Sequence, residues 1–395
     1  MDREQKIRSI SLMIVVGFAA AVFFHYWMGV YRNMGYPYNT FLFRPIDRWN
    51  DFYWLFRISG DPYSVVRGFS NLPFLYRYAS LFTVLPAKLG LLAHLASFVL
   101  FFACVAWRNL RTPSVLSTAM NVFAFSFLSY PFLITIDRAN WEATVFICLY
   151  MFALLYKKHS YISALFLALA IALKAFPVVL AILLLSDRRW RELIFAAGVA
   201  LALYLLSYIS FPGGLCANLA GNVDNLRVYA QFYVVGNEGL YFGNNLLGAV
   251  KFILLLLNPA ATPNIPVFIA VMFALLACVV VYVVCIEKRF WRKVALLVCA
   301  LNLLPVVSGD YKLLHLFIPL YLFINENEPA RHDWVYTALF GLLLIPKNYY
   351  RIPSLPEANI SILANPLLML LLAGVIVVTG TRAYATERRK AVQEG

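Results

Sequence analysis

Residues 8–30 read RSISLMIVVGFAAAVFFHYWMGV, an apolar run with one charged residue, Arg8, at its start. A helix that spans a bilayer needs about 20 consecutive apolar residues, so this run is long enough to cross a membrane once. Basic residues precede the run, which resembles the start of a signal peptide, but similar runs follow along the chain. We therefore interpret residues 8–30 as an uncleaved first span of a polytopic membrane protein.

The composition supports a membrane protein and excludes several other classes. The 395 residues are 62% hydrophobic and 13% charged, against roughly 45–50% and about 25% in soluble domains. This excludes a soluble enzyme, a disordered chain and a disulfide scaffold. The net charge is +14, and the expected anionic partner is a lipid head group or lipid phosphate, with no nucleic acid partner. The six Cys show no metal-ligand spacing, so neither a disulfide framework nor a zinc site is expected.

The apolar runs predict the topology. They cover roughly 8–30, 89–107, 113–136, 141–156, 161–185, 193–211, 244–257, 266–286, 294–308, 313–324, 334–346 and 361–380. Lys and Arg in short loops stay on the cytoplasmic side. The short basic loops fall on the cytoplasmic side if 161–185 is a hairpin turning near Lys174–Pro177 and if 244–257 lies at, or dips into, the outer face. We expect an all-α polytopic protein with about 12 transmembrane segments and both termini cytoplasmic, in one domain, 1–395.

Under this topology the polar residues at membrane depth gather on the outer side, which an anchor or scaffold does not require. They are Asp47, Asp51, Asp61, Asp137, Arg138, Asn140, Glu142, Lys174, Asp224, Asp310, Tyr311, Lys312 and His315.

The longest outer segment, 31–88, alternates aromatic and basic residues, as expected for helices in the membrane interface. Either this loop anchors the chain at the interface, or it collects a phosphate-bearing lipid. Asp51 precedes the aromatic run 52–54, and a carboxylate in a half-apolar place is suited to accept a proton from a hydroxyl. Asp61 favours a structural turn, and Asp47 is flanked by Arg44 and Arg48, which favours simple pairing.

Three further outer elements each have a structural and a functional interpretation. The turn 137–142 is either a local Asp–Arg pair with an Asn cap or a polar cluster that orients a sugar or phosphate. Lys174 either extends its ammonium to the surface or contacts a phosphate. His315, near Lys312, is either a core histidine or part of a site.

Several stretches resemble one group of proteins. DFYW at 51–54 with GDPY at 60–63 resembles the "DFxxYY…GxDPY" signature in the first outer loop of polytopic GT-C glycosyltransferases. LALAIALKAFP at 167–177 resembles the "KxxP" helix of glycosyltransferase family 87 within that group. RAN at 138–140 resembles its "RGN/RGQ" turn, with Ala139 in place of the usual Gly. GNNLLG at 243–248 resembles its "NxSLxG" stretch without the Ser, and SGDYKLLH at 308–315 resembles its polar turn before the last spans.

The resemblance implies a GT-C-like fold and a transferase that uses a polyprenyl-phosphate sugar at the extracytoplasmic face. Asp51 matches the family's catalytic base, and Lys174 and the region of His315 match positions that face the donor phosphate. Arg138 and Lys312 are further candidates for the donor phosphate. The candidate substrate-binding residues are Asp137, Asn140, Tyr63, Asn245, Asp310 and Tyr311.

The expected reaction is inverting transfer of a sugar, with mannose favoured, to a glycolipid or polysaccharide acceptor. No cofactor or metal is required by the pattern, although Asp51 and Asp137 leave a shared divalent cation open. Short cytoplasmic loops favour a bacterial plasma membrane. The alternatives are a flippase or transporter for a lipid-linked oligosaccharide and an envelope polysaccharide polymerase or ligase. A flippase should carry charged residues along a path through both leaflets, often with inverted repeats, and neither is evident here.

Overall fold

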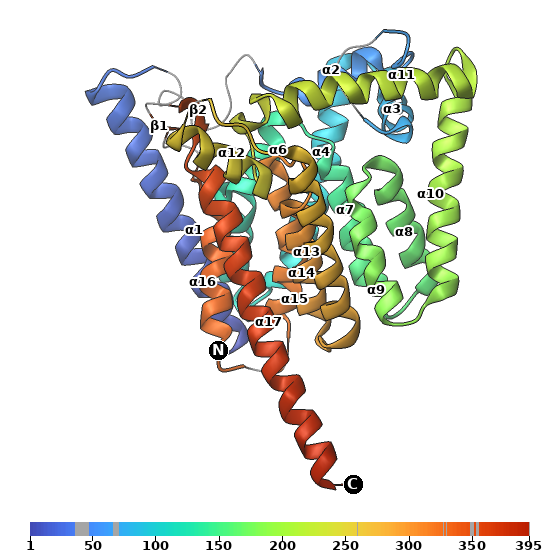
Figure 1. The fold of residues 1–395 in the computed structure, drawn as a ribbon. Coiled ribbons are helices and arrows are strands. Elements are labelled where there is room, and N and C mark those ends of the chain that lie inside the picture. The colour runs from blue at the N-terminus through green and yellow to red at the C-terminus, as the bar shows by residue number, and fades with distance from the viewer. Residues whose placement is uncertain are drawn as a thin grey trace.

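The computed structural model describes residues 1–35, 47–65, 71–258, 260–326, 328, 330–347, 351–352 and 355–394, and in these it is almost entirely helical (Figure 1). Arg44 of the expected Asp47 pairing lies outside the described residues. Within these described ranges, the departure from an all-α fold is a short antiparallel hairpin of β1 (Arg351–Ile352) and β2 (Leu355–Asn359).

The elements fall into three sets. The long helices are α1 (Arg3–Tyr26, continued by η1, Trp27–Tyr31), α4 (Ala87–Leu110), α10 (Trp190–Ser210), α13 (Ile265–Cys285) and α17 (Ser361–Glu394). The shorter helices are α2 (Asn50–Ile58), α3 (Pro73–Ser80), α5 (Val115–Phe123), α6 (Tyr130–Arg138), α7 (Glu142–Leu155), α8 (Ser160–Leu173), α9 (Ala181–Ser186), α11 (Gly214–Tyr229), α12 (Leu246–Leu257), α14 (Phe290–Leu303), α15 (Phe317–Ile324) and α16 (Asp333–Leu344). The brief 3-10 or π-helical segments are η3 (Leu81–Val84), η4 (Ala124–Leu128), η5 (Phe176–Leu180), η6 (Ala230–Val235), η7 (Glu238–Tyr241) and η8 (Asp310–Leu316).

The helix lengths identify a multi-pass membrane protein. Among the described residues, 5 helices are long and apolar enough to cross a bilayer. A sixth span results if the helical segments 115–128 and 130–138, which meet at a bend of 53°, count as one. The other apolar helices are too short to cross alone in a straight path, so the expected number of about 12 crossings stays a prediction.

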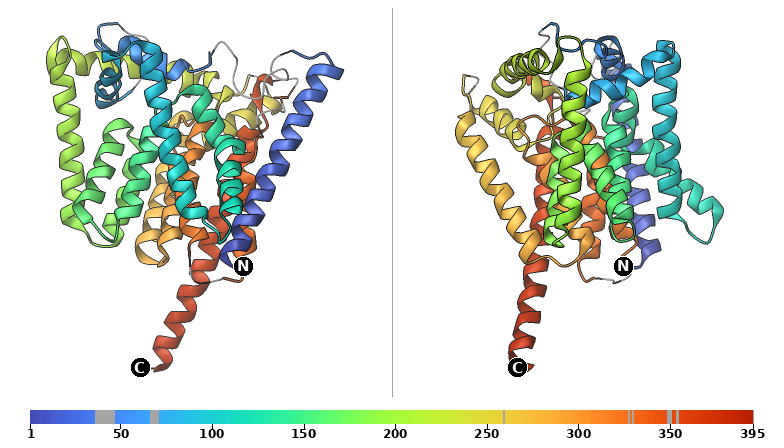
Figure 2. Two further views of the ribbon diagram at one scale, coloured as in Figure 1. Left: turned by 180° about the vertical axis from the view of Figure 1, so that it is seen from behind. Right: turned by 90° about the vertical axis from the view of Figure 1, so that its right-hand side faces the viewer.

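The bundle has two distinct ends. Both termini lie at the lower end of Figure 1, where the end of α17 projects beyond the other helices. The upper end carries α2, α3, α11, α12 and the β-hairpin, and α11 runs across the top of the bundle whereas α10 runs along it (Figures 1 and 2). The two termini therefore lie at the same end of the molecule, as the charge pattern predicts.

The two irregular stretches also agree with the sequence prediction. α8 ends at Leu173, Lys174 has an extended backbone (φ −144°, ψ 141°), and η5 begins at Phe176 with Pro177 in its first turn. Proline lacks the N–H that a continuous helix needs, which explains the break at this point. η5 packs against α8, so 160–186 forms a hairpin. α12 lies at the upper end beside the β-hairpin (Figure 1).

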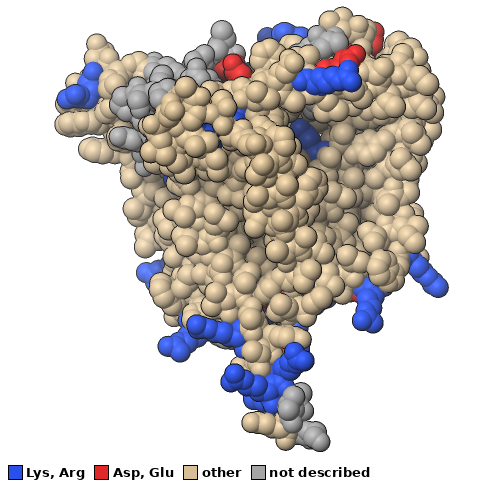
Figure 3. Space-filling view, in the orientation of Figure 1, with Lys and Arg blue, Asp and Glu red and all other residues tan. Residues whose placement is uncertain are grey.

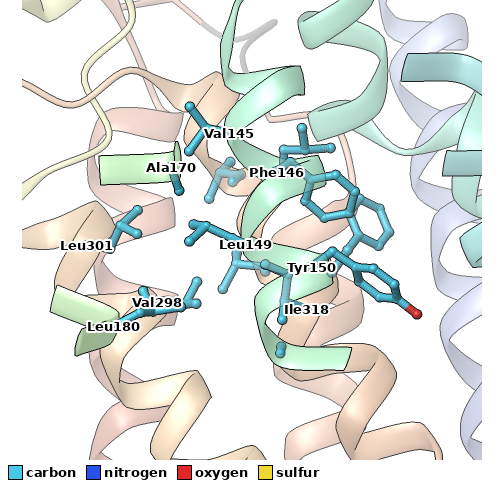
Figure 4. Packing of buried hydrophobic residues seen from close by; sticks show 14 of the residues in the cluster. Val145, Phe146, Leu149, Tyr150, Ala170, Leu180, Val298, Leu301 and Ile318 are labelled. Carbon is cyan, nitrogen blue, oxygen red and sulfur yellow. The ribbon is translucent and has the colours of Figure 1, made fainter. Parts of the chain in front are cut away.

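The core is a continuous cluster of buried aromatic and aliphatic side chains contributed by most of the helices. Phe102 is fully buried, and its ring centroid lies 4.8 Å from that of Phe132 and 4.9 Å from that of Phe317. Figure 4 shows the neighbouring layer, in which Leu149 of α7 lies among aliphatic residues of the adjacent helices. Because lipid is as apolar as these side chains, close van der Waals packing holds the helices together.

The outer surface matches a bilayer setting. Large apolar side chains such as Leu12, Leu100, Ile194 and Phe273 are more than half exposed. Figure 3 shows basic side chains at the lower end, charges of both signs at the upper end and a mostly uncharged belt between them. This belt is the surface that lipid tails are expected to contact.

We expect Phe102→Ala to lower the free energy of unfolding by about 3–5 kcal/mol, because the cavity forfeits contacts on three sides. Phe123→Ala is the matched control, since Phe123 is 54% exposed toward the lipid side. Thermal unfolding of both purified variants in detergent measures the difference. Equal unfolding temperatures for the two variants would contradict this account of the core.

Candidate active site

Asp51 lies in the first turn of α2, at the upper end of the bundle, and both of its carboxylate oxygens are held by side chains from another segment. Arg138 Nη2 donates to Oδ1 at 2.6 Å, and Asn140 Nδ2 donates to Oδ2 at 2.5 Å. The indole of Trp141 donates to the Asp51 carbonyl oxygen at 3.2 Å. The carboxylate is nevertheless 22% exposed, so a substrate can approach it.

The turn after α6 supplies these partners because of its backbone geometry. α6 ends at Arg138, and Ala139 adopts a left-handed conformation (φ 47°, ψ 46°) that reverses the chain. Glycine is the residue that fits such a position most readily, which explains why the family pattern carries Gly there. Asn140 Oδ1 accepts the backbone N–H of Glu142 at 2.8 Å, which braces the turn. The expected Asn cap is wrong, because Trp141 occupies the N-cap position of α7 and no side chain caps that helix.

The turn is also fastened to the segment before α2. Arg138 Nη1 donates to the carbonyl of Asp47 at 2.9 Å, and the N–H of Trp49 donates to the carbonyl of Asp137 at 2.8 Å. Arg48 Nε lies 3.7 Å from the carboxylate of Asp137. Asp137 and Arg138 thus each form an ion pair with a residue of the outer loop, Arg48 and Asp51 respectively.

A layer of aromatic rings supports Asp51 from below. Phe52 stacks on Trp141 at 5.6 Å between centroids, and His94 lies 4.5 Å from Trp141. His94 is buried among these rings and Phe82. The layer fixes the orientation of α2 relative to α7, and therefore the direction of the carboxylate.

A second polar group lies close by, inside the bundle. His315 Nε2 lies 2.9 Å from Glu142 Oε2, and both side chains are essentially inaccessible to solvent. Glu142 interacts electrostatically with Lys174 and Lys312 as well. Lys312 Nζ lies 4.0 Å from the centre of the Phe176 ring, and Lys174 Nζ donates to Asn71 Oδ1 at 3.3 Å. Three predicted donor-phosphate residues are therefore gathered around one buried carboxylate.

Glu142 belongs to the turn 137–142, for which the sequence leaves a structural and a functional interpretation open. Its position in the first turn of an apolar helix is the signal in the sequence that singles it out. Glu142 Oε1 and His315 Nδ1 are both buried without a hydrogen-bond partner in the part of the chain that the structure describes. Buried polar atoms without partners are uncommon in native proteins, so these two atoms mark a place where a ligand or water is expected.

Tyr311 connects the two polar groups. Its phenol interacts electrostatically with Asp51, Arg138 and Glu142. Asp310, its neighbour, accepts a hydrogen bond from Tyr130 and is buried. Tyr311 thus lies near both the Asp51 pair and the Glu142 cluster, and Tyr130 holds its neighbour Asp310 in place.

The 308–310 segment is held in place by the predicted Asn-rich stretch. Gly243 and Gly309 form an isolated antiparallel bridge, and the N–H of Asn244 donates to the carbonyl of Ser308 at 2.9 Å. Asn245 caps α12 through its Oδ1 and donates from Nδ2 to the carbonyl of Pro305 at 2.6 Å. Its side chain therefore has a structural task that the sequence pattern did not indicate.

Tyr63 lies apart from the two polar groups. Its ring contacts Tyr76, Tyr208 and Phe211, and its backbone lies directly beneath Gly221 of α11, where a Cβ would come within 2.7 Å of the Tyr63 carbonyl oxygen. Burial raises the pKa of the Tyr63 phenol, which keeps it protonated. The structure thus places Tyr63 in a packing layer beneath α11.

The site shows no preformed metal centre in the described part of the chain, where no group of three or more His, Cys, Asp or Glu side chains is arranged to hold an ion. Basic atoms are visible in a hollow below the level of α11 (Figure 3). The arrangement is suited to an anionic ligand more than to a cation.

The comparisons with known proteins identify the class. The family model of glycosyltransferase family 87 matches residues 69–309, more than half of the chain. The protein therefore belongs to glycosyltransferase family 87, and it is a multi-pass membrane glycosyltransferase. Comparison with curated proteins and with solved structures gave no match. The matched region contains Arg138, Glu142 and Lys174, whereas Asp51 and His315 lie outside it.

We expect Arg138→Ala to lower the free energy of unfolding by about 1.5–3 kcal/mol, because it leaves the half-buried Asp51 carboxylate without its cationic partner. The control is Arg227→Ala, which removes an ion pair with Asp224 whose side chains are 74% and 51% exposed. Such surface pairs contribute at most about 1 kcal/mol. Thermal unfolding in detergent compares the two, and an equal effect would show that the Asp51 pair does not hold the loop.

Proposed function

We propose that this protein transfers a sugar from a polyprenyl-phosphate donor to an acceptor hydroxyl, with inversion at the anomeric carbon and Asp51 as the general base. The observation that carries the proposal is the pairing of two features at one end of the bundle. One is an oriented, partly exposed carboxylate, and the other is a buried group of cations around Glu142. Transfer from a lipid phosphate needs a base and a cationic site for the leaving group.

Asp51 is suited to act as the base because it is oriented and still has free acceptor capacity. A carboxylate has about four lone-pair sites, and Arg138 and Asn140 occupy only part of them. The acceptor hydroxyl would donate to a remaining site as its oxygen attacks the anomeric carbon. Arg138 holds the carboxylate through Oδ1 and so fixes the direction from which the proton is taken.

The leaving group is a polyprenyl phosphate, whose negative charge grows as the glycosidic bond breaks. Lys174 and Lys312 supply positive charge where that phosphate would lie. His315, whose Nε2 lies 2.9 Å from Glu142 Oε2, holds this carboxylate in place beside the two lysines. Cations placed in advance in a region of low dielectric stabilise developing charge without rearranging during the reaction.

The membrane setting supports this chemistry. The donor lipid would enter sideways from the bilayer toward the hollow beneath α11 (Figure 3). The basic loops, including 108–111, 157–158, 188–191 and 288–293, follow the predicted cytoplasmic pattern. We therefore place the upper end outside a bacterial plasma membrane, in a GT-C-like arrangement of about 12 crossings. Mannose is the favoured sugar, and the acceptor is a glycolipid or polysaccharide.

A flippase or transporter of lipid-linked oligosaccharide is the competing class. It would need polar groups along a path through both leaflets. Glu142, His315 and Asp310 each have a buried polar atom without a partner among the described residues, and they belong to elements that meet at one site near the upper end. A charged group concentrated at one site favours a reaction chamber over a conduit.

Asp51→Asn should reduce sugar transfer by about 10²–10⁴-fold, because the amide has nearly the same size and shape but cannot accept the proton. The matched control is Asp61→Asn, the same change in the same outer loop at a turn residue, for which near-normal activity is expected. Rates are measured with purified protein in detergent, and thermal unfolding verifies that both variants fold. Near-normal transfer by Asp51→Asn would overturn the role of Asp51.

The donor class is tested with purified protein, polyprenyl-phosphate mannose and a lipid-diphosphate oligosaccharide, each offered separately with membrane-lipid acceptors. We expect transfer only from the monophosphate donor, with an inverted anomeric configuration in the product as determined by NMR. Transfer from the diphosphate donor alone would identify a polymerase or ligase. Movement of the donor across vesicles without transfer would identify a flippase.

A further inference from the structure

A cavity of about 270 Å³ lies at the lower end of the bundle, opposite the candidate active site. The ends of α4, α7 and α15 enclose it, and its lining comprises Arg108, Asn109, Tyr150, Ala153, Leu154, Ile318, Tyr321, Leu322 and Asn325. Its position follows from Arg3 in the first turn of α1, which donates to the carbonyls of Asn109 and Arg111 and to Asn325 Oδ1. A space of this size would hold about nine waters, or a lipid headgroup.

The lining has one polar side and one apolar side. Tyr150 lies beside Ile318 with its hydroxyl pointing away from the core cluster (Figure 4). Tyr150 accepts a hydrogen bond from Asn109 Nδ2 at 2.8 Å, which leaves its own proton available to a ligand. Ile318, Leu154 and Leu322 supply the apolar side. Such a lining suits a molecule with a polar head and an apolar tail.

Tyr321 points to an absent ligand. It lines the cavity, it is 2% exposed, and its hydroxyl has no hydrogen-bond partner among the described residues. A buried hydroxyl without a partner costs about 1–3 kcal/mol. The cavity is the adjacent space from which such a partner can come.

Arg108 gives the cavity its charge. It is exposed, no carboxylate lies among the lining residues, and it forms no ion pair within the described ranges. The carbonyl ends of three helices meet here, and such ends carry partial negative charge that would repel an anion. Other basic residues already cap those ends: Arg3 caps α4, Arg189 bonds the Tyr156 carbonyl after α7, and Lys6 bonds the Phe323 carbonyl of α15. The guanidinium of Arg108 is therefore available to bind an anionic ligand.

We propose that this cavity binds the phosphodiester headgroup of an anionic glycerophospholipid. The Arg108 guanidinium matches phosphate oxygens, the hydroxyls of Tyr150 and Tyr321 donate to the headgroup, and the first part of the tails lies along Ile318 and Leu322. Trp107, 42% exposed, adjoins Arg108 at the end of a candidate span. Tryptophan and arginine at that level mark the headgroup layer, which favours a lipid over a soluble phosphate.

The test is a binding titration of delipidated full-length protein in detergent, read by native mass spectrometry. The probes are phosphatidylglycerol, diacylglycerol as the lipid without a phosphate, and inorganic phosphate as the soluble anion. We expect saturable binding of one phosphatidylglycerol, at least about 10-fold tighter than diacylglycerol. Arg108→Gln should weaken it about 10- to 100-fold, and Tyr321→Phe about 2- to 10-fold.

The matched control is Arg111→Gln, which removes an exposed arginine from the same helix end without touching the cavity. It should bind phosphatidylglycerol as the unmodified protein does, as should Lys174→Gln at the opposite end. Equal binding of phosphatidylglycerol and diacylglycerol would overturn the proposal. So would equal losses in Arg108→Gln and Arg111→Gln, or inorganic phosphate binding as tightly as the lipid.

Discussion

The ion pair between Asp51 and Arg138 is the contact on which the candidate site depends. It joins a helix of the outer loop to the turn between α6 and α7, at a distance of 2.6 Å between Nη2 and Oδ1. The hydrogen bonds from Asn140 and Trp141 fix the same helix at two further points. Together with the stacking of Phe52 on Trp141, these contacts fix the position of α2. With them, one carboxylate oxygen has a fixed place beside the buried cations.

The stability of the Glu142 cluster depends on the balance between the cost of burying charges and the interactions that compensate it. Burying an ion in an apolar interior is unfavourable unless a partner and further hydrogen bonds compensate it. Glu142 has His315 at 2.9 Å and two lysines in its field. Two lysines and one buried carboxylate give the cluster a net positive charge. Glu142 Oε1 and His315 Nδ1 lack hydrogen-bond partners among the described residues. A bundle optimised only for stability would replace such a group with apolar side chains, so its presence is consistent with a ligand that brings negative charge.

At the lower end of the bundle, the basic residues Lys6 and Arg189 have partners within the chain. Lys6 lies 3.1 Å from Asp333 and also donates to the carbonyl of Phe323. Arg189 pairs with Glu192 and caps a helix end. Both charges are satisfied by the chain itself, and Lys6 ties α1 to α15 and α16. Arg108 differs from them because it has no such partner among the described residues.

The sequence alone determined the membrane class, the family resemblance, the break at Lys174–Pro177 and the placement of both termini at one end. These follow from local properties: the length of apolar runs, a proline that stops a helix, and the bias of basic loops. It also selected Asp51, Lys174, Lys312 and His315, which the fold gathers at the upper end. It did not single out Glu142 within the turn 137–142, did not foresee that Arg138 pairs with Asp51, and did not indicate that Tyr63 packs beneath α11 or that Asn245 caps α12. Only the tertiary structure decided these points, because Asp51 and Arg138 are 87 positions apart and Glu142 and His315 are 173 apart. Contacts over such separations are set by how the helices pack, and the local sequence around each residue does not specify them.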